Sequence, residues 1–177
     1  MLSQFEYNYN ELVKRVAYEG TERQTRAGNT SSLFGTMLKI HCLKQGLFPI
    51  LTARKIYYKP VLGELAAFVR GCEDLADFKY FGCNYWDANA KAWSGNDEVP
   101  ETHLKVGKIY GAQWRDFNGV DQLETLIYNL KTDPNSRRHL LTTYNPAELH
   151  LGCLPPCHLL AQFNVTPDHF LDCCVSM

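Results

Sequence analysis

The residue with the clearest capacity for chemistry is Cys157, which follows a proline pair and precedes a histidine in the run Pro155-Pro156-Cys157-His158. Each proline fixes its own φ angle and removes a backbone donor, so the chain that enters Cys157 is stiff. A stiff approach to an apolar, strand-like run suits a thiol that must be aimed at a substrate. The alternative is a small buried apolar side chain, as most cysteines are, and spacing alone favours that alternative.

Arginines are the second group of candidates. Arg137 and Arg138 stand directly before the apolar run 140–144, which is typical of a buried strand. Arg26 lies in a loop of small and polar residues, 21–32. A guanidinium offers a planar fork of donors that matches a phosphate or a carboxylate, so both places are candidate anion sites. The alternative for each is an ordinary solvated surface.

Glu64 is a carboxylate inside a run whose apolar residues predict a helix over 60–71. Position 64 lies near the edge of the apolar sector, so we expect its side chain to be partly buried. A buried carboxylate is costly unless it is paired or hydrogen-bonded. Glu64 is therefore a candidate functional acid, and a place on the wet face of the helix is the alternative.

The cysteine pattern argues against a metal centre. The chain has 7 cysteines, an odd number, and it is not a short secreted chain, so we interpret them as free thiols in a reducing compartment. A site built from Cys153, Cys157 and His158 is disfavoured because a second ligand pair is missing. We expect no bound metal.

Composition and charge narrow the classes of function. The 177 residues are 45% hydrophobic and 21% charged, which indicates one globular domain with a real core. A net charge of -1 gives no broad electrostatic case for a nucleic-acid or membrane partner. No apolar run approaches the ~18 residues of a membrane span. The N-terminus lacks the features of a signal peptide, so we expect a cytoplasmic protein.

Hydrophobic periodicity and turn residues predict interspersed helices and strands. We expect a loop over 21–32, a polar surface insertion over 91–106, helices over 5–19, 60–71, 74–80 and 119–131, and strands over 33–38, 39–43, 140–144, 158–165 and 170–175.

Taken in order, these pieces resemble the thymidylate synthase family over essentially the whole chain. The most specific match runs from Arg137-Arg138 through Tyr144-Asn145-Pro146-Ala147-Glu148-Leu149 to Leu154-Pro155-Pro156-Cys157-His158 and Gln162-Phe163, and the segment 110–117 is a second match. The resemblance implies an α+β fold, a large mixed sheet flanked by helices, as a single catalytic domain over residues 1–177. It also implies a homodimer whose sheets pack back to back.

The resemblance assigns the catalytic roles. Cys157 is expected to be the nucleophile that adds to C6 of the uracil ring of dUMP, with the thiolate as the reactive form. Glu64 is expected to organise water and proton transfer near the pyrimidine, and Tyr110 to help to remove the proton from C5. The one-carbon and hydride donor is 5,10-methylenetetrahydrofolate, and the products are dTMP and dihydrofolate.

The resemblance assigns the binding roles as well. Arg26, Arg137 and Arg138 are similar to phosphate ligands of the family, and the adjacent pair is expected to reach the phosphate site of the partner subunit. His158 and Gln162 are similar to residues around the nucleotide, and Trp86 and Asp87 to the edge of the folate pocket. Ala67 and Asn89 stand where the family usually has tryptophan, which removes aromatic surface from the folate region.

The chain ends at Met177, where the family continues with further strands and binding residues, so the resemblance implies a C-terminally truncated domain. Unpaired strands and exposed apolar surface would leave such a chain poorly stable alone. Two other functions stay open. One is a deoxypyrimidine-nucleotide hydroxymethylase of the same family, in which water traps the methylene. The other is an inactive fragment that acts only as a binding or dimerisation module.

Overall fold

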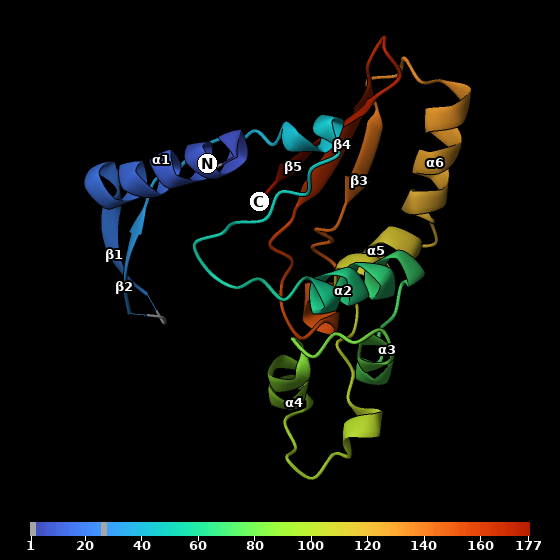
Figure 1. Ribbon diagram of the computed structural model, residues 1–177. Coiled ribbons are helices and arrows are strands. Elements are labelled where there is room, and N and C mark those ends of the chain that lie inside the picture. The colour runs from blue at the N-terminus through green and yellow to red at the C-terminus, as the bar shows by residue number, and fades with distance from the viewer. Residues whose placement is uncertain (1–2, 26–27) are drawn as a thin grey trace. The chain divides into compact units, whose positions relative to one another are not determined.

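The computed structural model describes residues 3–25 and 28–177, without the side chain of Cys42 (Figure 1). These residues form two compact units, Met1–Ile56 and Tyr57–Met177. Helices and small sheets alternate along the chain, which confirms the α+β class. The expectation of a single catalytic domain over residues 1–177 stays a prediction.

The first unit begins with the predicted helix, α1 (Gln4–Glu19), which is confirmed. The Ser3 side chain caps it by accepting a hydrogen bond from the Glu6 N–H, 3.2 Å long. One oxygen of the Glu6 carboxylate accepts hydrogen bonds from the backbone N–H and the hydroxyl of Thr52. The buried charge of Glu6 is therefore paired with donors near the end of the first unit.

The prediction of a loop over 21–32 is wrong, because this stretch contains an antiparallel hairpin of β1 (Thr21–Thr25) and β2 (Gly28–Ser32). Thr25 pairs with Gly28, and Gly28 has a φ of 97°, which glycine adopts without strain. The strands predicted over 33–43 are also wrong. The structure has no strand there, only a short 3-10 helix, Cys42–Gln45, and most of the side chains around it are exposed.

Helices supply much of the second unit. The predictions over 60–71, 74–80 and 119–131 are confirmed as α2 (Tyr58–Arg70), α3 (Leu75–Tyr80) and α6 (Gln122–Thr132). Two further helices, α4 (Asp87–Ser94) and α5 (Tyr110–Arg115), were not expected. In the described residues, no helix combines the length and apolar character that crossing a membrane requires.

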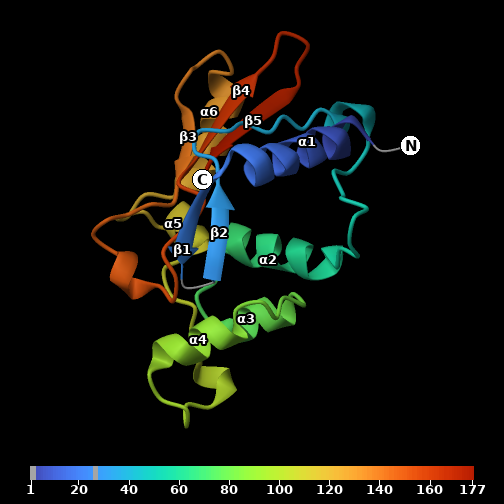
Figure 2. The same cartoon turned by 90° about the vertical axis from the view of Figure 1, so that its left-hand side faces the viewer.

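The stretch 91–106 is more than a surface insertion, and that expectation is corrected. Leu104 and Val106 are buried in the core of the second unit. An isolated β-bridge joins Lys105 to Asp74 and holds this stretch beside the start of α3. Figure 2 shows α2, α3 and α4 one below the other, with the connection after α4 at the far end.

The sheet of the second unit has three antiparallel strands in the order β3-β4-β5. The strands are β3 (His139–Thr142), β4 (Leu160–Val165) and β5 (Leu171–Ser176), close to the predicted ranges. The register pairs His139 with Phe163 and Gln162 with Cys174. Helix α6 lies along β3, as Figure 1 shows, and every residue of β5 is exposed.

The core of the second unit contains a cluster of aromatic rings around Phe68, which meets Phe78 and Trp86 edge to face and Tyr110 at a tilt. Phe68 of α2 lies 5.8 Å from Phe78, 6.3 Å from Trp86 and 5.0 Å from Tyr110 between ring centroids. Gly111 lets α5 approach α2 this closely, because a Cβ at that position would lie 2.3 Å from the Phe68 Cα. The glycine after Tyr110 therefore fixes the distance between the helices that carry the candidate residues.

His139, the first residue of β3, is a buried polar residue, with 1% of its surface exposed. Within the described residues, neither of its ring nitrogens has a hydrogen-bond partner. A buried polar group without a partner costs free energy that an apolar side chain of similar size avoids.

We expect His139→Leu to raise the free energy of unfolding by about 1–3 kcal/mol, since the apolar side chain carries no unpaired nitrogen. Urea denaturation followed by circular dichroism measures the change. The control is His103→Leu, because His103 is exposed and its replacement removes no buried polar group. A loss of stability in His139→Leu would show that the ring has a partner such as a bound water.

Candidate active site

Cys157 lies in the loop between the 3-10 helix Leu149–Leu151 and β4, and its side chain is exposed. Its backbone N–H donates a 2.9 Å hydrogen bond to the hydroxyl of Tyr110. Pro155 and Pro156 have no N–H, so Cys157 offers the first main-chain donor after Leu154. The Tyr110 hydroxyl therefore fixes the backbone at Cys157 through this hydrogen bond.

Tyr110 is the first residue of α5, and 8% of its surface is exposed. Its ring packs between Phe68, at 5.0 Å, and His158, at 5.3 Å between centroids. Burial raises the pKa of the Tyr110 phenol above its usual value of 10.0. The hydroxyl is therefore protonated at neutral pH.

His158 follows the cysteine and has an exposed side chain. Its backbone carbonyl accepts a hydrogen bond from the hydroxyl of Thr143, a buried residue directly after β3. The Thr143 N–H donates to the Leu159 carbonyl at 3.0 Å. These bonds continue the contact between β3 and β4 as far as His158, the residue directly after Cys157.

Glu64 is half-buried on α2, as the sequence predicts. Its carboxylate accepts a 2.8 Å hydrogen bond from the indole Nε1 of Trp86, which is 7% exposed. The centroids of Trp86 and Tyr110 lie 6.3 Å apart. Glu64 is therefore connected to Cys157 through two aromatic side chains, and the structure brings these four predicted residues and His158 together.

Asp87 begins α4, directly after Trp86, and forms an ion pair with Lys79 through Oδ1. Its other oxygen, Oδ2, is buried, and in the part of the chain that the structure describes it has no hydrogen-bond partner. Asp87 also lines a cavity of about 190 Å³ with Lys91, Asp97 and Glu101. The Oδ2 oxygen of Asp87 can therefore accept a hydrogen bond.

The remaining predicted residues lie elsewhere. Arg137 and Arg138 are exposed just before β3, and neither guanidinium has an ion-pair partner among the described residues. Gln162 is exposed on β4, where it stands between Leu140 and Cys174 in the register. Arg26 lies outside the described residues.

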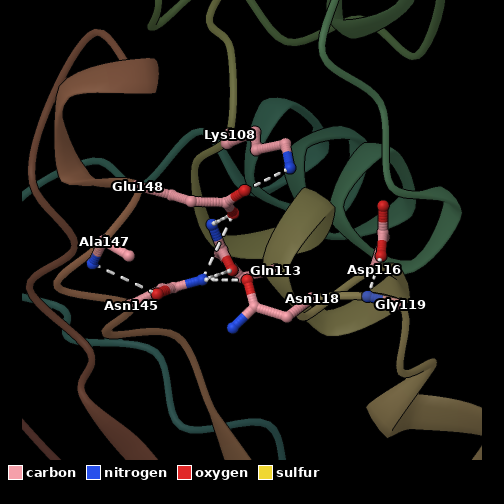
Figure 3. Close-up of polar contacts among 8 residues, drawn as sticks. All are labelled: Lys108, Gln113, Asp116, Asn118, Gly119, Asn145, Ala147 and Glu148. Atoms are coloured by element: carbon pink, nitrogen blue, oxygen red, sulfur yellow. Dashed lines mark hydrogen bonds and ion pairs between the residues drawn. The ribbon is translucent and has the colours of Figure 1, made fainter.

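A polar network beside the site was missed by the sequence reasoning (Figure 3). Glu148 accepts hydrogen bonds from Lys108 Nζ at 2.6 Å and from Gln113 Nε2 at 2.9 Å. Asn145 Nδ2 donates to Glu148 Oε2 at 3.2 Å and to Asn118 Oδ1 at 3.1 Å. The network joins both ends of α5 to the loop that follows β3.

The charges of this network stabilise each other. The Lys108 ammonium and then the Gln113 amide hold the pKa of Glu148 below its usual value of 4.5. The same bond raises the pKa of Lys108 above 10.5. Asn145 precedes a proline at a turn, and the family match includes Asn145, Glu148 and Gln113, but no role was predicted for them. Nothing in the spacing of Lys108 and Glu148 indicates that they meet.

No cluster of three or more histidine, cysteine or acidic side chains in the described residues could hold a metal ion. The cysteines whose side chains are described are all free, in agreement with the sequence interpretation. Cys153, four residues before Cys157, differs from it in environment. Burial raises the pKa of the Cys153 thiol to about 11, so this thiol is protonated at neutral pH.

The Glu148 carboxylate predicts a specific pH dependence of stability. Its contribution is present above pH 4.5, where the carboxyl is ionised in both states, and is lost as the pH falls through the lower pKa of the folded state. We therefore expect the difference in unfolding free energy between wild type and Glu148→Gln to be largest near pH 7 and to shrink towards pH 3.5. Urea denaturation at several pH values measures it, with the exposed Glu98→Gln as control. A constant difference would contradict the ion pair.

Comparison with known proteins agrees with the resemblance seen in the sequence. The sequence profile of the family described as thymidylate synthase matches residues 7–177. The chain is 38% identical to thymidylate synthase from Equine herpesvirus 2, over 93% of this chain and 62% of that protein. It is 36% identical to thymidylate synthase 1/2 from Encephalitozoon cuniculi, over 95% and 62%, and 37% identical to thymidylate synthase from Enterobacteria phage T4, over 93% and 58%.

The chain therefore spans about 60% of the length of the curated relatives it matches. The match covers almost all of this chain and includes Cys157 with the residues around it. On this evidence, the chain belongs to the thymidylate synthase family.

Proposed function

We propose that this chain carries the nucleophile half of a thymidylate synthase active site, which converts dUMP to dTMP with 5,10-methylenetetrahydrofolate. The observation that supports the proposal best is the Cys157 loop. The thiol is exposed, its backbone is bonded to Tyr110 at 2.9 Å, and the Tyr110 ring contacts His158 at 5.3 Å. Membership of the family makes a methyltransferase-type reaction the expected chemistry.

Cys157 is the proposed nucleophile. Its thiolate forms a bond to C6 of the uracil ring, and the electron pair of the C5–C6 double bond moves towards C5 and the C4 carbonyl oxygen. C5 thereby becomes nucleophilic. When the C6–S bond later breaks, the electron pair returns to sulfur and the thiolate is restored. An exposed thiol on a stiff approach is suited to both steps.

Proton transfer falls to Tyr110 and Glu64. Because burial raises its pKa, the Tyr110 phenol is neutral at pH 7 and would orient a water that takes the C5 proton, rather than act as a phenolate base. One oxygen of Glu64 is bonded to the Trp86 indole, which directs the carboxylate and leaves the other oxygen for water near the pyrimidine. This pairing supports the proposed role of Glu64 in proton transfer.

Arg137 and Arg138 are proposed to bind phosphate. Both are exposed directly before β3 and are not occupied by carboxylates of the described chain. Their place at the start of a sheet strand supports a role across a homodimer interface, in the phosphate site of the partner subunit. His158 and Gln162, both exposed, are proposed to contact the nucleotide, and Arg26 stays a predicted phosphate ligand.

Trp86 and Asp87 are proposed to form the edge of the folate pocket. When bound, 5,10-methylenetetrahydrofolate supplies the methylene carbon and a hydride. The buried Oδ2 of Asp87, which has no hydrogen-bond partner among the residues that the structure describes, suits an N–H donor of such a ring, and Asp87 is proposed to hold it. Trp86 is 7% exposed and packs on Phe68 and Phe78, so it supports the edge of the pocket more than it stacks on a ligand.

The proposal is tested by incubating the 177-residue chain with 5-fluoro-dUMP and 5,10-methylenetetrahydrofolate. Fluorine at C5 blocks the loss of the proton that normally completes turnover, so a competent site retains a covalent complex. We expect intact and peptide mass spectrometry to map the complex to Cys157. Cys157→Ser should abolish it, because the serine hydroxyl is a far weaker nucleophile than a thiol.

The matched control is Cys153→Ala. Cys153 lies four residues away and has a thiol whose pKa is about 11, so its removal should leave the complex at Cys157 intact. If a well-folded chain forms no covalent complex, the proposed activity is wrong for this chain alone. Nucleotide binding without the complex would then support the binding-module alternative.

A further inference from the structure

The segment that leads to Cys157 is bonded at successive points to the segment that leads into α5. The Lys108 N–H donates to the Leu151 carbonyl at 2.9 Å, and the Cys153 N–H donates to the Val106 carbonyl at 2.9 Å. The last bond of the series runs from the Cys157 N–H to Tyr110. The segments 106–110 and 148–157 therefore move as a pair, and their relative position sets the position of the thiol.

The ion pair at the start of this series is shielded and short. Lys108 Nζ lies 2.6 Å from Glu148 Oε1, and the two side chains are 26% and 17% exposed. The exposed pair of Lys105 and Asp74 is 3.4 Å apart and 60% and 53% exposed. Surface pairs contribute little, whereas a shielded pair with further hydrogen bonds resists displacement. Figure 3 shows Gln113 and Asn145 pointing to the same carboxylate.

Lys108 stands two residues before Tyr110, and Glu148 stands at the start of the segment that ends at Cys157. Gln113 extends the contact to the other half of α5, since its side chain donates to Glu148 at 2.9 Å. The carboxylate therefore contacts the chain on both sides of Tyr110, at Lys108 before α5 and at Gln113 within it, so a displacement of Glu148 reaches the phenol from two directions.

We propose that Lys108 and Glu148 are positioning residues: their ion pair sets the place of the Tyr110 hydroxyl and, through it, the backbone of Cys157. Neither residue touches the proposed reacting atoms. The functional meaning rests on the proposed role of Cys157 as nucleophile, because an aimed thiol gains from a backbone held to within a fraction of an ångström.

The test is amide hydrogen exchange at cysteine, measured by NMR on the intact chain labelled with ¹⁵N only in its cysteines. The Cys157 amide reports directly on the bond to Tyr110. The Cys83 amide, bonded to the Phe78 carbonyl at 2.9 Å, and the Cys72 amide, bonded to the Ala67 carbonyl at 3.1 Å, report on the core. No nucleotide is needed, so this result is independent of whether the chain forms the 5-fluoro-dUMP complex.

In Lys108→Met and Glu148→Gln we expect the Cys157 amide to exchange about tenfold faster, because loss of a charged hydrogen bond makes local opening more frequent. The Cys83 and Cys72 amides should keep their wild-type rates. Lys108→Arg retains the charge and should stay within about twofold of wild type. The matched control is Lys105→Met, the same substitution at the exposed pair three residues upstream, which should change nothing.

The Tyr110→Phe variant distinguishes an effect on the position of Cys157 from a general effect on stability. Tyr110→Phe removes the acceptor, so Glu148→Gln should add no further acceleration at Cys157 in that background. An equal acceleration of all cysteine amides would overturn the proposal, since the pair would then only stabilise the fold. An unchanged Cys157 rate, or an additive effect with Tyr110→Phe, would overturn it as well.

Discussion

The geometry around the reactive thiol depends on one hydrogen bond, from the Cys157 N–H to the Tyr110 hydroxyl. The two prolines before Cys157 provide stiffness but no donors, so the loop cannot be fixed through them. The acceptor must therefore come from another element, and its own position must be secure. Burial of the Tyr110 ring, the close approach of α5 to α2 at Gly111 and the Lys108–Glu148 pair all serve this requirement.

The sequence predicted the helices and strands that have strong hydrophobic periodicity. It failed where contacts with distant segments decide the local structure. Helices α1, α2 and α6 carry clear apolar stripes, and Gly71 marks the end of α2 with a left-handed φ of 72°. The stretch 33–43 is rich in apolar residues but forms no strand, because β-propensity needs a neighbouring strand to take effect. Helix α5 was not predicted because its six residues include a glycine and two aromatic residues, which are typical of a turn.

The residues of the candidate site also fall into those that the sequence predicted and those that it did not. Cys157, His158, Glu64, Tyr110 and Trp86 could be named from motifs of the family, and the structure brings them together. The ion pair of Lys108 with Glu148 could not be named from the sequence. The two residues are 40 positions apart, a separation that matches no helical or strand periodicity, and only the folded chain brings them together. Similarly, His139 is buried with no partner among the described residues, which contradicts the expectation for a polar residue and follows from tertiary packing alone.

The bond between Glu64 and Trp86 gives the protein an internal optical reporter. An indole whose Nε1 donates to a carboxylate at 2.8 Å has an emission that depends on that neighbour, and the Tyr110 ring lies close enough to transfer excitation to it. The indole is buried, so quenchers in solvent reach it slowly, whereas the half-exposed Trp93 is open to them. Separation of α2 from Trp86 would thus change the fluorescence of one tryptophan while the helices persist, which distinguishes disruption of the site from unfolding of the chain.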